Sequence, residues 1–93
     1  MATSTCKDFA TTKKRFASLA VDIVAMREFK TKRGGMMAFL SVEDETGSLD
    51  NITVFSEPLT EHSDILFEGN SVLIEGKRDK KYDSLIVDKA WQI

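Results

Sequence analysis

The alternation of side chains from Met36 to Phe55 constrains the fold of this chain more than any other feature. Apolar residues recur at every second position of its first half: Ala38, Leu40 and Val42. This is the period of a strand that buries one face. Turn-forming residues occupy positions 43–47 and end in a glycine able to adopt positive φ. β-Branched Ile52 and Val54 then resume the alternation. The stretch therefore predicts two strands joined by a tight polar turn.

The same parity places Phe39 on the face opposite the core residues. An exposed aromatic ring in mid-strand lowers solubility, and stacking of a nucleobase is one function that would keep it there. The alternative interpretation is that Phe39 packs beneath a loop or against a neighbouring domain. The pattern alone does not favour either interpretation.

The rest of the chain supplies further candidate elements. Residues 16–29 fit the apolar stripe of a helix as well as the alternation of a strand. Ser56 begins a helix-start pattern in which it would be the N-cap and Pro58 would lie in the first turn. Phe55, just before it, could lie on the same face as Phe39 by parity, but is expected instead to be a core residue at a strand end. Two further strands are predicted, at residues 71–76 and from Leu85 to Trp91.

Composition limits the class of protein. Ninety-three residues, 42% apolar and 30% charged, are typical of one globular domain with a modest core. No apolar run approaches the length of a membrane span, and residues 1–16 lack a secretion signal. A single cysteine and a single histidine make a disulfide or a zinc site unexpected. We therefore expect a cytoplasmic protein without a metal or other cofactor and without a membrane partner.

The net charge of −2 conceals a strong segregation of charge along the chain. Residues 1–35 carry eight bases and three acids, residues 36–76 carry nine acids and no base, and residues 77–93 carry five bases and three acids. A basic stripe on an acidic molecule can still attract phosphates, because local potential rather than net charge acts on them.

The string KTKRGGMMAFLSVEDETGSLDNITVF, residues 30–55, resembles the OB-fold nucleic-acid-binding domain of bacterial DNA polymerase III alpha subunits. The shared pattern is a basic T-K-x-G turn, then M-A-F, an acidic T-G turn and a strand that ends in phenylalanine. Anticodon-binding OB domains of class II aminoacyl-tRNA synthetases show a weaker version. The resemblance extends over residues 17–93. Two departures are Asp22, where the family usually has glycine, and an extra residue near Asp50 and Asn51, which suggests a β-bulge.

The resemblance implies an all-β fold, a five-stranded OB-fold Greek-key barrel with one short helix between the third and fourth strands. It favours a strand over residues 16–29. The barrel domain would comprise residues 16–93, preceded by an arm, residues 1–15, that is either mobile or held in place by Phe9. Leu59, Ile65 and Leu66 would cover one end of the barrel.

In OB folds, nucleic acid crosses the second and third strands between two flanking loops. In the anticodon-binding OB domains that share the weaker pattern, the phenylalanine that matches Phe39 stacks on a base, and the resemblance implies the same role for Phe39. Its expected neighbours are Met37, Asn51 and Thr53, with Tyr82 at the rim. The flanking loops would supply Lys30, Lys32 and Arg33 on one side and Lys77, Arg78, Lys80 and Lys81 on the other. Lysine and arginine also simply solubilise loops, but the absence of bases from residues 36–76 favours binding.

Two classes of function follow from these residues. The first is a module that binds single-stranded nucleic acid, DNA in preference to RNA, with a polymerase or another replication protein as a candidate partner. The second is a protein-interaction or oligomerisation module that uses the same face of the barrel. No nucleophile–base pair, phosphate loop or metal-ligand spacing indicates an enzyme.

Overall fold

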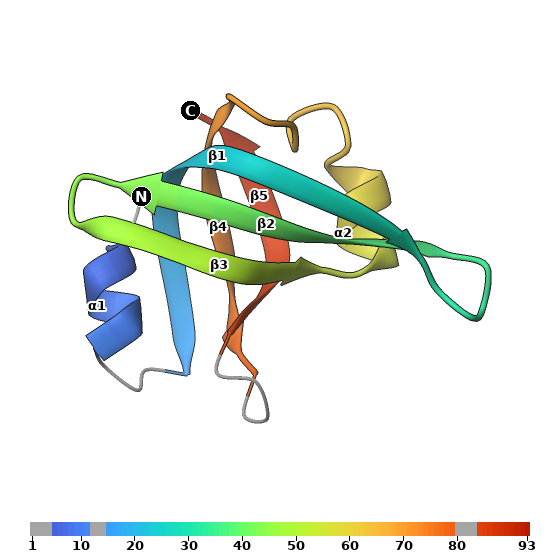
Figure 1. Ribbon diagram of the computed structural model, residues 1–93, viewed down its shortest axis with the longest axis horizontal. Coiled ribbons are helices and arrows are strands. Elements are labelled where there is room, and N and C mark those ends of the chain that lie inside the picture. The colour runs from blue at the N-terminus through green and yellow to red at the C-terminus, as the bar shows by residue number, and fades with distance from the viewer. Residues whose placement is uncertain (1–4, 12–14, 80–83) are drawn as a thin grey trace.

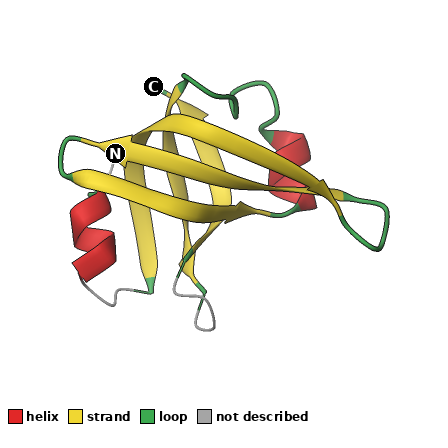
Figure 2. Cartoon of the chain, in the orientation of Figure 1, coloured by secondary structure: helices red, strands yellow, loops and turns green. Residues whose placement is uncertain are grey.

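The computed structural model describes residues 5–11, 15–79 and 84–93. Its elements are, in chain order, α1 (Cys6–Thr11), β1 (Phe16–Lys30), β2 (Met36–Asp44), β3 (Gly47–Val54), α2 (Ser56–Glu61), β4 (Ser71–Arg78) and β5 (Leu85–Gln92). The five strands close into a barrel in the order β1-β2-β3-β5-β4, with α2 between β3 and β4 in sequence (Figure 1, Figure 2). The predicted OB-fold barrel is confirmed.

The ambiguous segment at residues 16–29 is a strand because it pairs on both sides. The first half of β1, Phe16 to Asp22, pairs with β4, and the second half, Asp22 to Lys30, pairs with β2. The register with β2 skips Val24, which is exposed in a β-bulge where β1 passes from one partner to the other. Asp22 lies at this corner and accepts a hydrogen bond from the Ser71 hydroxyl.

The predicted inward face of β2 is confirmed. Ala38, Leu40 and Val42 are fully buried, as are Ile52 and Val54 of β3. Aliphatic side chains of the other three strands complete this core: Leu19, Val21, Ile23, Val72, Ile74, Leu85 and Val87. Leu59 and Leu66 are buried and Ile65 packs against the same cluster, so the segment that contains α2 covers the barrel end as predicted.

The predicted β-bulge in β3 is also present. Ile52 pairs with Leu40, but the next inward pair joins Leu49 to Val42, so Asp50 and Asn51 together oppose Ser41. The extra residue shifts the parity of the strand. As a result Leu49 packs against the core, and Asp50 is exposed beside Ser41.

Two details predicted for the start of α2 are wrong. The N-cap is Phe55, not Ser56, and it makes no side-chain capping bond, because the chain is still extended at Phe55 and already helical at Ser56. Phe55 is 48% exposed rather than a core residue. Ile52 and Val54 face inward, so the position after Val54 faces outward by the alternation of β3, and the strand ends before it.

The segment expected as an arm contains α1, which is attached to the barrel at several points. Cys6 and Phe9 are buried in the core. The Cys6 amide donates to Asp44 Oδ2 at 2.8 Å, and the Lys7 amide donates to Thr46 Oγ1 at 3.1 Å. Both acceptors lie at the β2–β3 turn. The alternative in which Phe9 anchors this segment agrees with its position in the structure.

No helix in the described parts of the chain is long and apolar enough to cross a membrane. Among residues 5–11, 15–79 and 84–93, no group of three or more His, Cys, Asp or Glu side chains is arranged to hold a metal ion.

Candidate nucleic-acid interface

The outer surface of the barrel carries a continuous row of paired residues, which we call the outer row. Successive neighbours across the strands are Arg27 on β1, Phe39 on β2, Thr53 on β3, Ile86 on β5 and Lys77 on β4. Residues paired in this way point to the same side of a sheet. The outer row therefore has a cationic side chain at each end, Arg27 on β1 and Lys77 on β4. The path between them crosses β2, β3 and β5.

Two aromatic rings lie beside one another on this surface. The rings of Phe29 and Phe39 meet edge to face, with centroids 5.5 Å apart and planes at 66°. Phe39 is half-buried, whereas Phe29 is 44% exposed at a position where β1 pairs with Met37. The structure thus adds a second ring to the single aromatic platform expected from the sequence.

A groove of about 530 Å³ opens beside the two rings. Its lining comes from β1, β2 and the bulge of β3: Ala25, Arg27, Phe29, Phe39, Ser41 and Asp50. A hollow of this volume lies within the ordinary range of small-ligand sites, about 300–1,000 Å³. It combines apolar ring surface with one cationic and one anionic side chain, which suits a planar polar group such as a nucleobase.

The loop between β1 and β2 projects beyond the barrel (Figure 1). It carries exposed Lys32 and Arg33, and exposed Lys30 is the last residue of β1 just before it. Its shape is fixed by hydrogen bonds within the loop. The Thr31 amide donates to the Gly35 carbonyl at 2.7 Å, and the Gly34 amide donates to the Thr31 carbonyl at 3.0 Å. Gly34 has φ of +86°, a conformation that favours glycine. Three cations are therefore presented next to Phe29.

The residues predicted at the other loop differ in their surroundings. Lys77 is exposed at the end of the outer row. Arg78 is half-buried. Its guanidinium donates a hydrogen bond to the Phe9 carbonyl and lies 4.0 Å from the centroid of the Phe9 ring. Lys80, Lys81 and Tyr82 lie outside the described residues, as does the side chain of Asn51.

The two predicted neighbours of Phe39 within the sheet contribute unequally to the surface. Met37 is half-buried and faces the same side as Phe39. Thr53 is directly opposite Phe39 but is buried, since the parallel pairing with Ile86 of β5 encloses it. Thr53 is therefore the buried member of the outer row and exposes little surface to a ligand.

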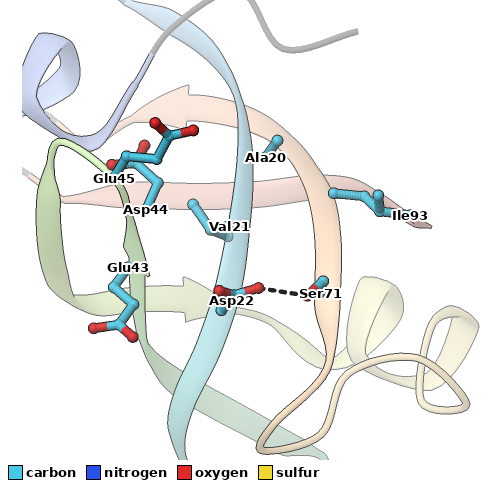
Figure 3. Close-up of a pocket in the computed structure, with 8 residues that line it drawn as sticks. All are labelled: Ala20, Val21, Asp22, Glu43, Asp44, Glu45, Ser71 and Ile93. Carbon is cyan, nitrogen blue, oxygen red and sulfur yellow. Dashed lines mark hydrogen bonds between the residues drawn. The ribbon is translucent and has the colours of Figure 1, made fainter.

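A second hollow, of about 330 Å³, has the opposite character (Figure 3). Four carboxylates, those of Asp22, Glu43, Asp44 and Glu45, line it together with Ala20, Val21, Ser71 and Ile93. A phosphate backbone would be repelled there, because like charges raise the energy of the complex. We therefore exclude this acidic hollow as the nucleic-acid path.

Asp44 in this hollow holds α1 and the β2–β3 turn together. Burial acts to raise the pKa of its carboxyl, but hydrogen bonds from the Thr46 hydroxyl and from the Cys6 and Thr46 amides outweigh burial and lower the pKa to about 2. Burial, followed by the negative charge of Asp44, raises the pKa of the Cys6 thiol to about 12. Cys6 therefore stays a neutral thiol at physiological pH.

Comparison with known proteins identifies domains similar to this chain. Searching the sequence against protein-family models gives no match. Over 81 residues, 84% of the chain, it is 38% identical to the DNA polymerase III subunit alpha of Halalkalibacterium halodurans. Over 72 residues, 77% of the chain, it is 36% identical to the DNA polymerase III subunit alpha of Bacillus subtilis. The chain is an OB-fold domain similar to part of these alpha subunits.

The OB domain spans only 7% and 6% of the length of these two curated relatives. Its fold also matches a solved structure, the second OB-fold domain of replication protein A from Methanococcus maripaludis, with a TM-score of 0.63. That match covers 97% of this chain and 95% of the other, at 22% sequence identity, and so establishes the fold.

Of the six residues that line the OB domain's groove, only Phe39 was predicted from the sequence, and the five that were missed include Arg27, Phe29 and Asp50. Arg27 and Phe29 lie on the outer face of β1 only because the bulge at Val24 shifts the parity of that strand, and nothing in the sequence predicted this bulge. Asp50 did carry a usable signal. The bulge predicted at Asp50 and Asn51 implies that one of the two residues is turned from the inner to the outer face.

Proposed function

We propose that this OB domain binds single-stranded nucleic acid, DNA in preference to RNA, across β2 and β3. The observation that carries the proposal is the pair of rings, Phe29 and Phe39, flanked by Arg27 and by the basic β1–β2 loop. Aromatic side chains stack on any base, and cations track the phosphates on either side of the stack. In this arrangement Phe39 and Phe29 hold bases, while Lys30, Lys32, Arg33 and Lys77 contact phosphates.

Preference for a single strand follows from the geometry of stacking. A base within a duplex has both faces covered by its neighbours and cannot lie against a side-chain ring, whereas an unpaired base can. The described chain places no basic helix where it could enter a major groove, since α1 and α2 span only Cys6–Thr11 and Ser56–Glu61. The preference for DNA rests on the similarity to the polymerase subunits, and the same relationship suggests a replication protein as partner.

Charge keeps the interaction weak. The chain has a net charge of −2, so attraction is restricted to the basic loop and the outer row, and the acidic hollow repels the strand from the part of β1 and β2 beyond the groove. We expect a dissociation constant on the order of micromolar at moderate salt, towards the tighter end of the range for non-specific binding. The domain acts in this proposal as a binding module and not as a catalyst.

Fluorescence anisotropy with labelled single-stranded DNA, RNA of the same sequence and the DNA duplex tests the proposal. We expect the single-stranded DNA to bind most tightly, with an affinity that falls as salt is raised. Equal or tighter binding of the duplex would overturn single-strand preference, and tighter binding of RNA would overturn the preference for DNA.

A second candidate, protein interaction, is favoured by an apolar row on another wall of the barrel. Ala20, Leu73 and Trp91 are successive partners across β1, β4 and β5, and Trp91 is 43% exposed. Exposed aromatic rings are enriched in protein interfaces. Salt separates the two candidates, because an apolar interface lacks the slope of about −0.7 in log affinity against log salt for each phosphate contacted on a single strand.

A further inference from the structure

The groove beside Phe29 and Phe39 contains a carboxylate, which is an unexpected group on a surface for phosphates. Asp50 is exposed and lines this groove together with Arg27. It reaches the outer face only because the bulge in β3 shifts the parity of that strand. In a regular ladder Asp50 would follow the inward parity of Ile52, which is buried in the core.

Both charged groups of the groove are available to a ligand. Within residues 5–11, 15–79 and 84–93, neither Arg27 nor Asp50 has a side-chain hydrogen bond or an ion pair. A carboxylate only accepts hydrogen bonds when ionised, and a guanidinium only donates them. A phosphate would be repelled by Asp50, so the group that fits between Asp50 and the rings is a base and not the backbone.

We propose that this groove selects a base which presents an amino group next to a carbonyl or ring acceptor, as cytosine, adenine and guanine do, and disfavours thymine and uracil, which have no amino group. Asp50 would accept from the amino group, and Arg27 would donate to the acceptor on the same base. Acidic side chains accept from the cytosine amino group, and arginine donates to guanine O6 and N7, in the usual pairings of direct readout. Thymine offers a carbonyl where cytosine has the amino group, and that carbonyl would face the carboxylate. This inference rests on the single-strand binding proposed above.

The alternative explanation is a solvated surface acid with no role in binding. Most exposed aspartates are of this kind, and Asp64, exposed in the segment after α2, is an example on this chain. Asp50 differs from it in position, since it lies in the same 530 Å³ groove as two aromatic rings and a guanidinium. Asp64 therefore serves as the matched control, with the same change of charge away from the groove.

The test compares oligodeoxycytidine with oligodeoxythymidine of equal length, because the two bases are of similar size and differ at the amino position. Affinities are measured by anisotropy for the parent chain, Asp50→Asn and Asp64→Asn, at a slightly alkaline pH where oligodeoxycytidine stays unfolded. We expect the parent and Asp64→Asn to bind the cytosine strand about 5-fold more tightly, the lower end of the discrimination that a direct base contact provides. Asp50→Asn should bind both strands with nearly equal affinity, since an amide can also donate to thymine.

The outcomes separate this inference from the proposed function. If the parent binds both strands equally, or if Asp50→Asn keeps the preference for cytosine, base selection by Asp50 is wrong while single-strand binding stands. If neither strand binds to the folded parent, the proposed function fails and the inference fails with it. Circular dichroism of each variant establishes that the fold is retained, so a loss of preference cannot be assigned to unfolding.

Discussion

Leu40 and Phe39 are adjacent in β2, and their side chains lie on opposite sides of the barrel wall. Leu40 is fully buried among aliphatic residues, whereas Phe39 is half-buried and contacts Phe29. We expect Leu40→Ala to lower the free energy of unfolding by about 2–5 kcal/mol through lost burial and the cavity left behind. Phe39→Ala should lower it by less, since it loses an outer edge-to-face contact worth about 0.5–1.5 kcal/mol and part of its burial. Chemical denaturation of the two variants in parallel checks the order, and the reverse order would place β2 one residue out of register.

Asp44 makes the stability of the domain dependent on pH in the acid range. Its folded pKa is lowered to about 2 from an ordinary value of 3.8, so its hydrogen bonds stabilise the fold fully above about pH 4 and are lost as the pH falls through about 2. We expect Asp44→Asn to be less stable than the parent at neutral pH, because a neutral amide is a weaker acceptor for the Cys6 and Thr46 amides.

Thermal unfolding at a series of pH values measures this difference. The gap in stability between parent and Asp44→Asn should shrink below about pH 4 and close near pH 2. Glu45→Gln, an exposed neighbour in the same turn, is the control and should follow the parent throughout. A gap that stays constant with pH would show that Asp44 does not titrate through these hydrogen bonds.

At the residue scale, the sequence predicted which side chains face the core wherever the apolar pattern fitted a strand and not a helix. Strict alternation placed Ala38, Leu40 and Val42 inside and Phe39 outside. Phe55 was misplaced because a core position at the strand end was preferred to its parity, which puts it on the exposed face. The buried position of Thr53 depends on its pairing with β5, a contact between strands far apart in sequence.

Gly76 on β4 allows two strands to approach more closely than any side chain would permit. A Cβ atom built at Gly76 would lie 1.9 Å from the Ile86 carbonyl oxygen of β5, which is backbone and cannot move aside cheaply. The β4–β5 register also shifts at this point, between Glu75 and Gly76. Gly76 is therefore part of how the barrel closes.

We expect Gly76→Ala to lower the free energy of unfolding by about 1–3 kcal/mol or more, the range for groups forced into a packed interior. Lys89→Ala, at an exposed position of β5, is the control and should stay within about 0.5 kcal/mol of the parent. Denaturant melts of both variants test this, and equal stability of Gly76→Ala and the parent would mean that β4 and β5 separate at this point without loss.

Arg78 belongs to the attachment of α1, even though the sequence assigned it to the binding loop. Its guanidinium donates to the Phe9 carbonyl and stacks on the Phe9 ring, whereas neighbouring Lys77 is exposed on the outer row. We expect Arg78→Ala to reduce stability and to leave the salt slope of oligonucleotide binding unchanged. Lys77→Ala should do the opposite, leaving stability unchanged and making the slope shallower by up to about 0.7.

Melting curves and salt titrations of these two variants separate a structural cation from a binding one. A shallower salt slope for folded Arg78→Ala would return Arg78 to the binding site. The sequence could not make this distinction, because the contact joins residues that are 69 positions apart. The same long separation explains why the sequence could not decide whether the segment that contains α1 is mobile or is anchored by Phe9.

For the whole molecule, the uneven distribution of charge along the sequence becomes a division between surfaces. The bases of the β1–β2 loop and Arg27 lie beside the aromatic rings, whereas Asp22, Glu43, Asp44 and Glu45 gather in the acidic hollow. A strand that approaches the outer face of β1 and β2 is therefore attracted to the end near the β1–β2 loop and repelled from the end near Asp22 and Glu43. The segregation was readable from the sequence, but the grouping of Arg27 and Asp50 in one groove required the bulges in β1 and β3.

The central claim is that rings and cations bind a single strand together, the rings through bases and the cations through phosphates. The most direct measurement is anisotropy of a labelled single-stranded oligonucleotide across a salt series, for the parent, Phe39→Ala and the double variant Lys32→Ala with Arg33→Ala. Phe39→Ala should weaken binding by about 1–3 kcal/mol, the loss of one stacked base, with the salt slope unchanged. The double variant should make the slope shallower by up to about 1.4, as expected when two phosphate contacts on a single strand are lost. If both variants stay folded and bind as the parent does, the strand does not cross this face and the account is contradicted.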